Sequence, residues 1–202
     1  MGRKEIIRPR YNSETHTYFH PTQDRRLAGF SEIARAQGLI DFYGIPAPVL
    51  NHACDLGTAA HLAARYYDEK RLDTDSISAE VKPYLDAYIK FRADTGFVPD
   101  EIERPVANLT WGYACTPDRI GKFPSQRGRS VVEFKKAAHM EWHYIQMEAQ
   151  AACFPDVPDR LLVELMKNGR WKPRRANHAE ARYYRSIWQS AVQVYHFTKK
   201  GE

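Results

Sequence analysis

The chain has 202 residues, of which 43% are hydrophobic, so one globular domain with a sizeable core is expected. Its formal net charge of +5 at pH 7 favours an anionic partner but does not identify one. The sequence has no apolar run long enough to span a bilayer, no signal-peptide pattern and no Cys/His spacing typical of a zinc site. Three widely spaced cysteines argue against a disulfide framework, and we expect a reduced, cytoplasmic setting without membrane contact.

The charged residues are unevenly distributed along the chain. Segment 167–202 has nine Lys and Arg against two acids, and segment 119–136 has six against one, Glu133. Segment 68–103 is acidic instead, with ten acids against five Lys and Arg. A phosphate backbone would be attracted to the two basic segments. For segment 167–202, solvated charge on an ordinary helix is the alternative explanation.

The first part of the chain predicts a hairpin and a short helix. Residues 5–20 read as two short strands around a polar turn at 12–14. A helix follows within 29–42, with Ser31 as its N-cap and Gly38 as its stop.

The next helix carries the first candidate for a functional site. Prolines predict a loop over 43–50, and helical spacing of apolar residues predicts a helix over 51–73. Gly57 lies near its first turn, where it permits another backbone to approach closely. His61 stands next to small alanines that leave room for its ring to reach inward, although a lone interior histidine is more often structural.

The rest of the chain alternates between strands and helices. The pattern predicts a helix over 77–96 ended by Gly96, and then two antiparallel strands within 97–123. A strand over 129–137 and a helix over 141–154 follow. The last elements are a hairpin over 159–177, turned by Asn168-Gly169, and a helix from Asn177 with a capping box to Glu180. We read Asn108–Thr110 as the turn between the two strands, and Pro105 as the mark of an edge or bulge.

This order of elements predicts an α/β or α+β fold. Helices, three strands, a crossover helix, two strands and a closing helix fit a single domain, 1–202, with one central mixed sheet flanked by helices. Within it we distinguish an N-terminal hairpin and short helix (1–50), a core (51–176) and a C-terminal helix (177–202).

Segment 115–136 holds the residues with the clearest chemistry. Residues two apart on a strand share a face, so Glu133 and Lys135 project together while Val132 and Phe134 point to the opposite face. Asp118 precedes them on the neighbouring strand. Two carboxylates and an amine in one place suit a divalent metal held against a phosphodiester, with Asp118 and Glu133 holding the ion and Lys135 orienting or activating the attacking water.

Ordinary structural roles remain open for each of these residues. Glu133 and Lys135 are alternatively a salt bridge on an exposed strand face, and Asp118 is alternatively a turn-capping residue after Pro117. Gln146 is alternatively a plain surface residue of its helix.

Four motifs in order resemble one known family. "LGTAAH" on a helix, "TPDRIG" at a strand end, "VVEFKKA" on the next strand and "YIQMEAQA" on the following helix are similar to motifs of the PD-(D/E)XK nucleases, and more narrowly of the RecB-like and phage-exonuclease (lambda-exonuclease-like) branch. The resemblance covers residues 57–151. It implies a restriction-endonuclease-like fold.

The resemblance also implies a role for each matched residue. Asp118 and Glu133 would ligate Mg²⁺ or Mn²⁺, with a backbone carbonyl near Phe134 completing the shell and His61 adding a ligand that favours Mn²⁺. Lys135 would hold the nucleophilic water, and Gln146 would orient the lysine or the water. DNA contacts are expected from basic residues of the segment and from Gln150, namely Arg119, Lys122, Arg127, Arg129, Lys136 and Gln150.

The chain departs from the family pattern at one position, where Gln150 replaces a tyrosine. The iron-sulfur subgroups need four cysteines, so no such cluster is expected here. We expect DNA as the partner, with a helicase or an annealing protein as a further partner, in a bacterial cell or phage-infected host. The sequence leaves open whether the protein is a monomer or a ring-like homo-oligomer.

The favoured hypothesis is a metal-dependent deoxyribonuclease, in particular an exonuclease of recombination or DNA processing. Two alternatives remain. The first is a DNA-end-binding or accessory module with the same fold and no turnover. The second is a metal-free structural protein in which the Glu133–Lys135 pair is accidental.

Overall fold

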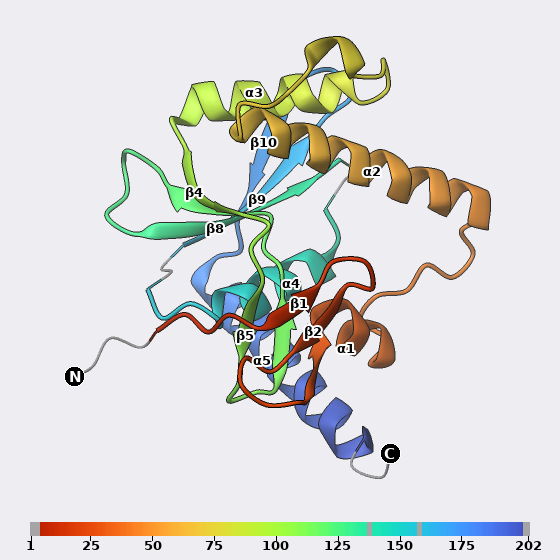
Figure 1. Cartoon of the computed structure of the whole chain (residues 1–202), viewed down its shortest axis with the longest axis vertical. Coiled ribbons are helices and arrows are strands. Elements are labelled where there is room, and N and C mark those ends of the chain that lie inside the picture. Colours follow the sequence, from red (N-terminus) through yellow and green to blue (C-terminus); the bar gives the residue numbers. More distant parts are fainter. Residues whose placement is uncertain (1–4, 137–138, 157–158, 200–202) are drawn as a thin grey trace.

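The computed structural model describes residues 5–136, 139–156 and 159–199, and within them it shows two five-stranded sheets and five α-helices (Figure 1). The expected mixture of helices and strands is therefore confirmed. The expectation of one central sheet is wrong, because the strands divide between two sheets. The C-terminal end of the expected helix 177–202, residues 200–202, and Ala137 of the expected strand 129–137 lie outside the described residues.

We call the larger sheet the main sheet. Its strands are, in spatial order, β10 (Trp171–Arg174), β9 (Asp159–Leu165), β8 (Arg129–Lys135), β7 (Arg119–Lys122) and β4 (Val98–Ile102). Strands β8 and β9 are parallel and the other neighbours are antiparallel. Helix α4 (Glu141–Ala151) connects β8 to β9, as a parallel crossover requires. The hairpin from β9 to β10 turns at Asn168-Gly169 as predicted, with Gly169 at a φ of 72°.

We call the other sheet the N-terminal sheet. Its strands are, in spatial order, β1 (Arg10–Asn12), β2 (Thr17–Phe19), β3 (Arg26–Gly29), β6 (Tyr113–Cys115) and β5 (Val106–Asn108). The predicted hairpin of β1 and β2 is confirmed, and the Asn12 side chain accepts hydrogen bonds from two backbone amides in its turn. Strand β6 runs parallel to β3 and brings the middle of the chain against its beginning.

The two strands expected within 97–123 are in fact four. Strands β4 and β7 pair in the main sheet, whereas β5 and β6 pair in the N-terminal sheet. The chain leaves the main sheet where Glu103 adopts a φ of 46°, just before Pro105, which has no amide to give to a ladder. It returns after β6, so that Asp118 lies between the two sheets in the chain.

The five helices lie where the sequence predicts them, with several ends displaced: the helix expected over 51–73 ends at Asp68, and the helix expected over 77–96 begins at Lys82. They are α1 (Phe30–Ala36), α2 (Ala47–Asp68), α3 (Lys82–Thr95), α4 and α5 (His178–Thr198), with a 3₁₀ turn at Thr74–Ser76. Helix α1 is preceded by Gly29 and not capped by Ser31. Helix α2 starts inside the expected loop, because its proline lies in the first turn, where a missing amide costs nothing.

Glycine and asparagine signals at the helix ends are confirmed. Gly38 and Gly96 adopt left-handed φ values of 67° and 64° just after α1 and α3. Asn177 caps α5 by accepting from the amides of Ala179 and Glu180, and Glu180 bonds back to the Asn177 amide. Among the described residues, none of the helices combines the length and apolar character that crossing a bilayer requires.

The main sheet lies between two helical layers. Figure 1 shows α2 and α3 on one side and α4 and α5 on the other. On β8, Val132 and Phe134 pack in the cluster that contains the α3 aromatic residues, whereas Val131 packs in the cluster that contains α4 and α5 residues. Because side chains alternate along a strand, Glu133 and Lys135 share the Val131 face and point toward α4.

Candidate active site

The Glu133 carboxylate and the Lys135 amine meet on the α4 side of the main sheet. Lys135 Nζ donates to Glu133 Oε2 at 3.1 Å. Glu133 is 1% exposed and the Lys135 side chain is 19% exposed. A salt bridge on an exposed strand face is therefore not what these residues form, and a charge pair in this position has a large desolvation cost.

Asp118 joins them from the start of the neighbouring strand. Its Oδ2 accepts from the amide of Phe134 at 2.8 Å, and its own amide donates to Glu133 Oε1 at 3.2 Å. The pairing of β7 with β8 thus brings the two acids together. Since the Asp118 carboxylate bonds to the next strand, turn capping does not describe its contact. Phe134 takes part through its amide N–H, and the expected metal contact of a carbonyl near Phe134 stays a prediction.

His61 reaches the same place from α2. Its Nδ1 lies 3.4 Å from Asp118 Oδ1. Burial, followed by the nearby positive charge of Lys135, lowers the pKa of His61 to about 4. The ring is therefore neutral near pH 7 and keeps a nitrogen lone pair, which a metal ligand requires.

Two glutamines of α4 surround the Glu133 carboxylate. Gln146 accepts from Lys135 Nζ and donates to Glu133 Oε2, both at 3.2 Å. Gln150 is fully buried and donates to Glu133 Oε1 at 2.5 Å. Gln146 is thus in contact with the lysine, as expected, and is not a plain surface residue. Gln150 reaches the site and holds Glu133 from the interior, and because it has no exposed surface its assignment as a DNA contact is wrong.

Burial and mutual repulsion shift the acids toward their protonated forms. Burial, followed by the charge of Asp118, raises the pKa of Glu133 to about 7. Burial also raises the pKa of Asp118. Burial alone would lower the pKa of Lys135, but the charges of Glu133 and Asp118 outweigh it and raise that pKa. Two acids share one ammonium ion, and a cation beside both of them would relieve their repulsion.

The donor set fits a hard divalent ion. Within the described residues, no group of three or more His, Cys, Asp or Glu side chains is placed to hold a metal ion. Asp118 and Glu133 offer two carboxylates, and Mg²⁺ commonly uses one or two carboxylates together with waters and substrate phosphate oxygens. His61 beside Asp118 is a nitrogen donor of the kind that suits Mn²⁺ better than Mg²⁺, but it does not form a three-ligand site with the two acids in this structure.

Arg119 does not belong to the DNA-binding surface, and its assignment as a DNA contact is wrong. Its side chain is completely buried, and its Nε donates to Asp68 Oδ2 at 2.7 Å. It also bonds to the backbone oxygen of Asp118, at 2.6 Å. A second guanidinium, that of Arg92, pairs with the other Asp68 oxygen. This buried network holds the start of β7, and therefore Asp118, from behind.

The other basic residues that were predicted to contact DNA lie toward the two ends of β8. Lys136 follows Lys135 at the end of β8, with its side chain beside Gly57 of α2. Lys122 and Arg127 are exposed at the opposite end, where Lys122 pairs with Arg129. At about 3.3 Å per residue, Arg129 is about 13 Å along the strand from Glu133. Arg129 is bound to Glu101 and Asp156, so its charge is already neutralised.

Two residues that contact the site or support it were not predicted from the sequence. Asp68 is one, although it follows His61 by seven positions, which places it on the same helix face. Trp142 is the other: Lys135 Nζ lies 5.6 Å from the centre of its ring. Trp142 lies four positions before Gln146, about one helical turn, and this spacing predicts that both side chains share one face of α4. The structure also brings Cys115 and Cys153 together in the core, with their Sγ atoms 3.8 Å apart.

Comparison of the chain with models of known protein families gives no match, and comparison with curated proteins gives no significant match. Function is therefore inferred from the motifs and from the geometry of this site.

Proposed function

We propose that the protein is a metal-dependent nuclease that hydrolyses phosphodiester bonds in DNA with Mg²⁺ or Mn²⁺. One observation carries the proposal: Asp118, Glu133 and Lys135 converge with His61 and Gln146 in one partly enclosed place. These residues come from four separate parts of the chain: α2, the start of β7, β8 and α4. Motifs that matched the family by accident would have no reason to lie together in the fold.

The residues divide the chemical work among them. Asp118 and Glu133 would hold the divalent ion, which would supply Lewis-acid chemistry by lowering the pKa of a water and neutralising charge on the phosphoryl group. In the metal-free protein the charges of Glu133 and Asp118 raise the pKa of Lys135, so its amine is a cation that can orient a water and stabilise negative charge. Gln146, bonded to both Lys135 and Glu133, fixes the position of the amine.

The remaining expectations follow from the family resemblance and belong to the same proposal. They are exonucleolytic action in recombination or DNA processing, release of 5′-phosphate ends without a covalent enzyme intermediate, and cooperation with a helicase or an annealing protein. A DNA-end-binding module without turnover is the alternative that the experiment must separate.

The test is a calorimetric Mn²⁺ titration beside digestion of linear and circular DNA, single- and double-stranded. The wild type should bind Mn²⁺ and cut DNA, and Asp118→Ala should do neither. The matched control is Asp86→Ala, since Asp86 is an exposed aspartate on α3. Mn²⁺ binding without any cutting would support the non-catalytic module, and absence of binding would refute the proposal.

A further inference from the structure

A cavity opens directly beside the candidate active site. Its volume is about 290 Å³, and it lies between β2 and β3 of the N-terminal sheet, helix α1 and helix α4. Gln146 and Gln150 form part of its wall, and both also bond to Glu133. A group in the cavity is therefore separated from the Glu133 carboxylate by one glutamine side chain.

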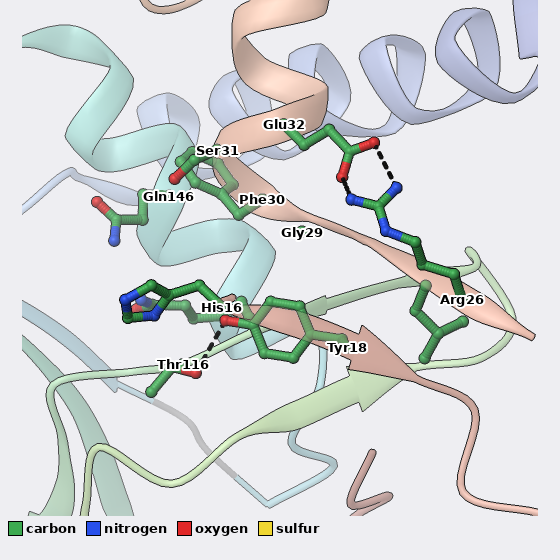
Figure 2. Close-up of a pocket in the computed structure, with 12 residues that line it drawn as sticks. His16, Tyr18, Arg26, Gly29, Phe30, Ser31, Glu32, Thr116 and Gln146 are labelled. Atoms are coloured by element: carbon green, nitrogen blue, oxygen red, sulfur yellow. Dashed lines mark hydrogen bonds and ion pairs between the residues drawn. The ribbon is translucent and has the colours of Figure 1, made fainter. Parts of the chain in front are cut away.

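The lining is aromatic and polar. Figure 2 shows the rings of Phe30 and Tyr18 on either side of the space, with Gln146 toward one end and the Arg26–Glu32 pair toward the other. Gln150 is fully buried, and its Oε1 lacks a hydrogen-bond partner among the described residues. Because that oxygen has no exposed surface, a ligand in the cavity does not reach it, and the half-buried Gln146 is the amide that the cavity offers to a ligand.

The charge of the cavity does not suit a phosphate group. Arg26 is the single Lys or Arg among the described residues that line it. Its guanidinium forms a two-bond ion pair with Glu32, at 3.0 and 2.6 Å. The positive charge is thus already neutralised, and the space offers rings, amides and hydroxyls to an uncharged ligand.

The size limits the ligand further. At roughly 30 Å³ per water molecule, the cavity has room for about ten waters. That is enough for one nucleobase and too little for a base pair. Nucleobases stack on aromatic rings and bond to amides along their edges, which is the chemistry of this lining.

We infer that this cavity binds a single unpaired nucleobase of the DNA strand whose backbone lies at Asp118 and Glu133. The inference rests on the proposed nuclease function and specifies its substrate. The nucleotide beside the scissile phosphate must leave its partner base to enter the cavity, so the substrate is single-stranded DNA or a frayed end. Residues of the N-terminal hairpin and α1 form the wall of the cavity that contacts this nucleotide.

The test places the fluorescent base 2-aminopurine at successive positions of a single-stranded oligonucleotide, bound in Ca²⁺ to limit cutting. One position should change its emission on binding, and an abasic nucleotide there should weaken binding at least tenfold. Ser31→Trp, which fills the cavity from α1, should weaken binding at least tenfold and remove the position-specific signal. The matched control is Ser190→Trp, because Ser190 is an exposed helical serine on α5. Circular dichroism checks the fold of both variants.

Three outcomes would overturn the inference: equal binding of abasic and intact oligonucleotides, a folded Ser31→Trp variant that binds like the wild type, or affinity that depends on a terminal phosphate and not on a base. The proposed nuclease function is tested separately by adding Mn²⁺. A position-specific signal without cutting would support the base-binding cavity and refute the nuclease function. Cutting by Ser31→Trp at the wild-type rate would support the nuclease function and refute the base-binding cavity.

Discussion

At the scale of single residues, Asp118 and Glu133 place two carboxylates in one buried place, with the single ammonium of Lys135 between them and α4. Full ionisation would leave a net negative charge in a poorly solvated position. Protonation of Glu133 is one way to relieve this charge, and a bound cation is the other. The two therefore compete, which makes cation binding dependent on pH.

We predict that Mn²⁺ affinity falls as the pH is lowered through 7. The pKa of Glu133 is raised from 4.5 to about 7, so the metal-free protein holds a proton there below pH 7 and the ion must displace it. The affinity should fall by up to about tenfold per pH unit below 7 and level off above 8. Without metal the same shift stabilises the fold most below pH 4.5, and that contribution is lost as the pH rises through 7.

Calorimetry in buffers of different ionisation enthalpy measures the linked proton. About one proton should be released per Mn²⁺ at pH 6, and almost none at pH 8.5. An affinity that stays constant between pH 5.5 and 8 would contradict this description of Glu133.

Asp68 should be among the most sensitive positions for stability. It is buried and pairs with Arg119 and Arg92, so its removal leaves two guanidinium groups without their partner. We expect Asp68→Ala to lower the free energy of unfolding by about 3–5 kcal/mol. Urea denaturation measures this loss. Asp86→Ala, which breaks the exposed pair with Lys82, should cost less than about 1 kcal/mol. Equal effects of the two changes would contradict the role assigned to Asp68.

Sequence spacing predicts the part of the site that is local. Glu133 and Lys135 share a strand face, and Gln146 and Gln150 are one helical turn apart, so their common location follows from periodicity. The role of Asp68 depends on Arg119, which is 51 positions away. No local pattern specifies that contact, and Arg119 therefore looked like a free cation of a basic loop.

At the scale of elements, two glycines have opposite constraints. A Cβ on Gly121 in β7 would lie 2.2 Å from the backbone oxygen of Val98, so β4 and β7 approach too closely there for a side chain. A Cβ on Gly57 in α2 would lie 3.4 Å from the Lys136 side chain, which is an ordinary contact. The neighbour of Gly57 is therefore a flexible side chain, and the close approach of another backbone that Gly57 would permit is not used here.

We predict that Gly121→Ala destabilises the protein by more than about 2 kcal/mol, because the clash is with backbone that cannot move aside without breaking the ladder. Gly57→Ala should instead stabilise it by about 0.5–1 kcal/mol through its higher helix propensity. Thermal unfolding of the two variants measures both effects. A stable Gly121→Ala protein would contradict the strand pairing described above.

Elements with explicit end signals are predicted well, as α3 with Gly96, α5 with Asn177 and the Asn168-Gly169 hairpin show. The division of segment 97–123 between two sheets is not predicted by the sequence, because the alternation of apolar residues is the same whichever sheet a strand joins. The partners of a strand are set by packing far away in the sequence.

At the scale of the whole molecule, the main sheet carries the acids and the N-terminal sheet forms one wall of the cavity beside them. The basic residues of 119–136 do not form one surface, because β8 separates Lys136 from Lys122. In the proposed nuclease, DNA lying across the site would therefore meet Lys136 before Lys122.

We predict that Lys136→Ala reduces the salt dependence of DNA binding more than Lys122→Ala does. One lost phosphate contact should lower the slope of log affinity against log salt by about 0.7 for a single strand. Fluorescence anisotropy between 50 and 200 mM salt gives both slopes. A larger effect of Lys122→Ala would place the DNA along the hairpin end of β8.

The most direct test of the account is the rate at which Lys135→Ala cuts end-labelled DNA in saturating Mn²⁺, with Mn²⁺ binding measured on the same preparation. Lys135 contacts Glu133 and Gln146, and in the proposed mechanism it orients the water and does not hold the ion. The variant should therefore bind Mn²⁺ and cut at least about 100-fold more slowly than the wild type. Cutting at the wild-type rate by Lys135→Ala, or no cutting by the wild type, would contradict the account.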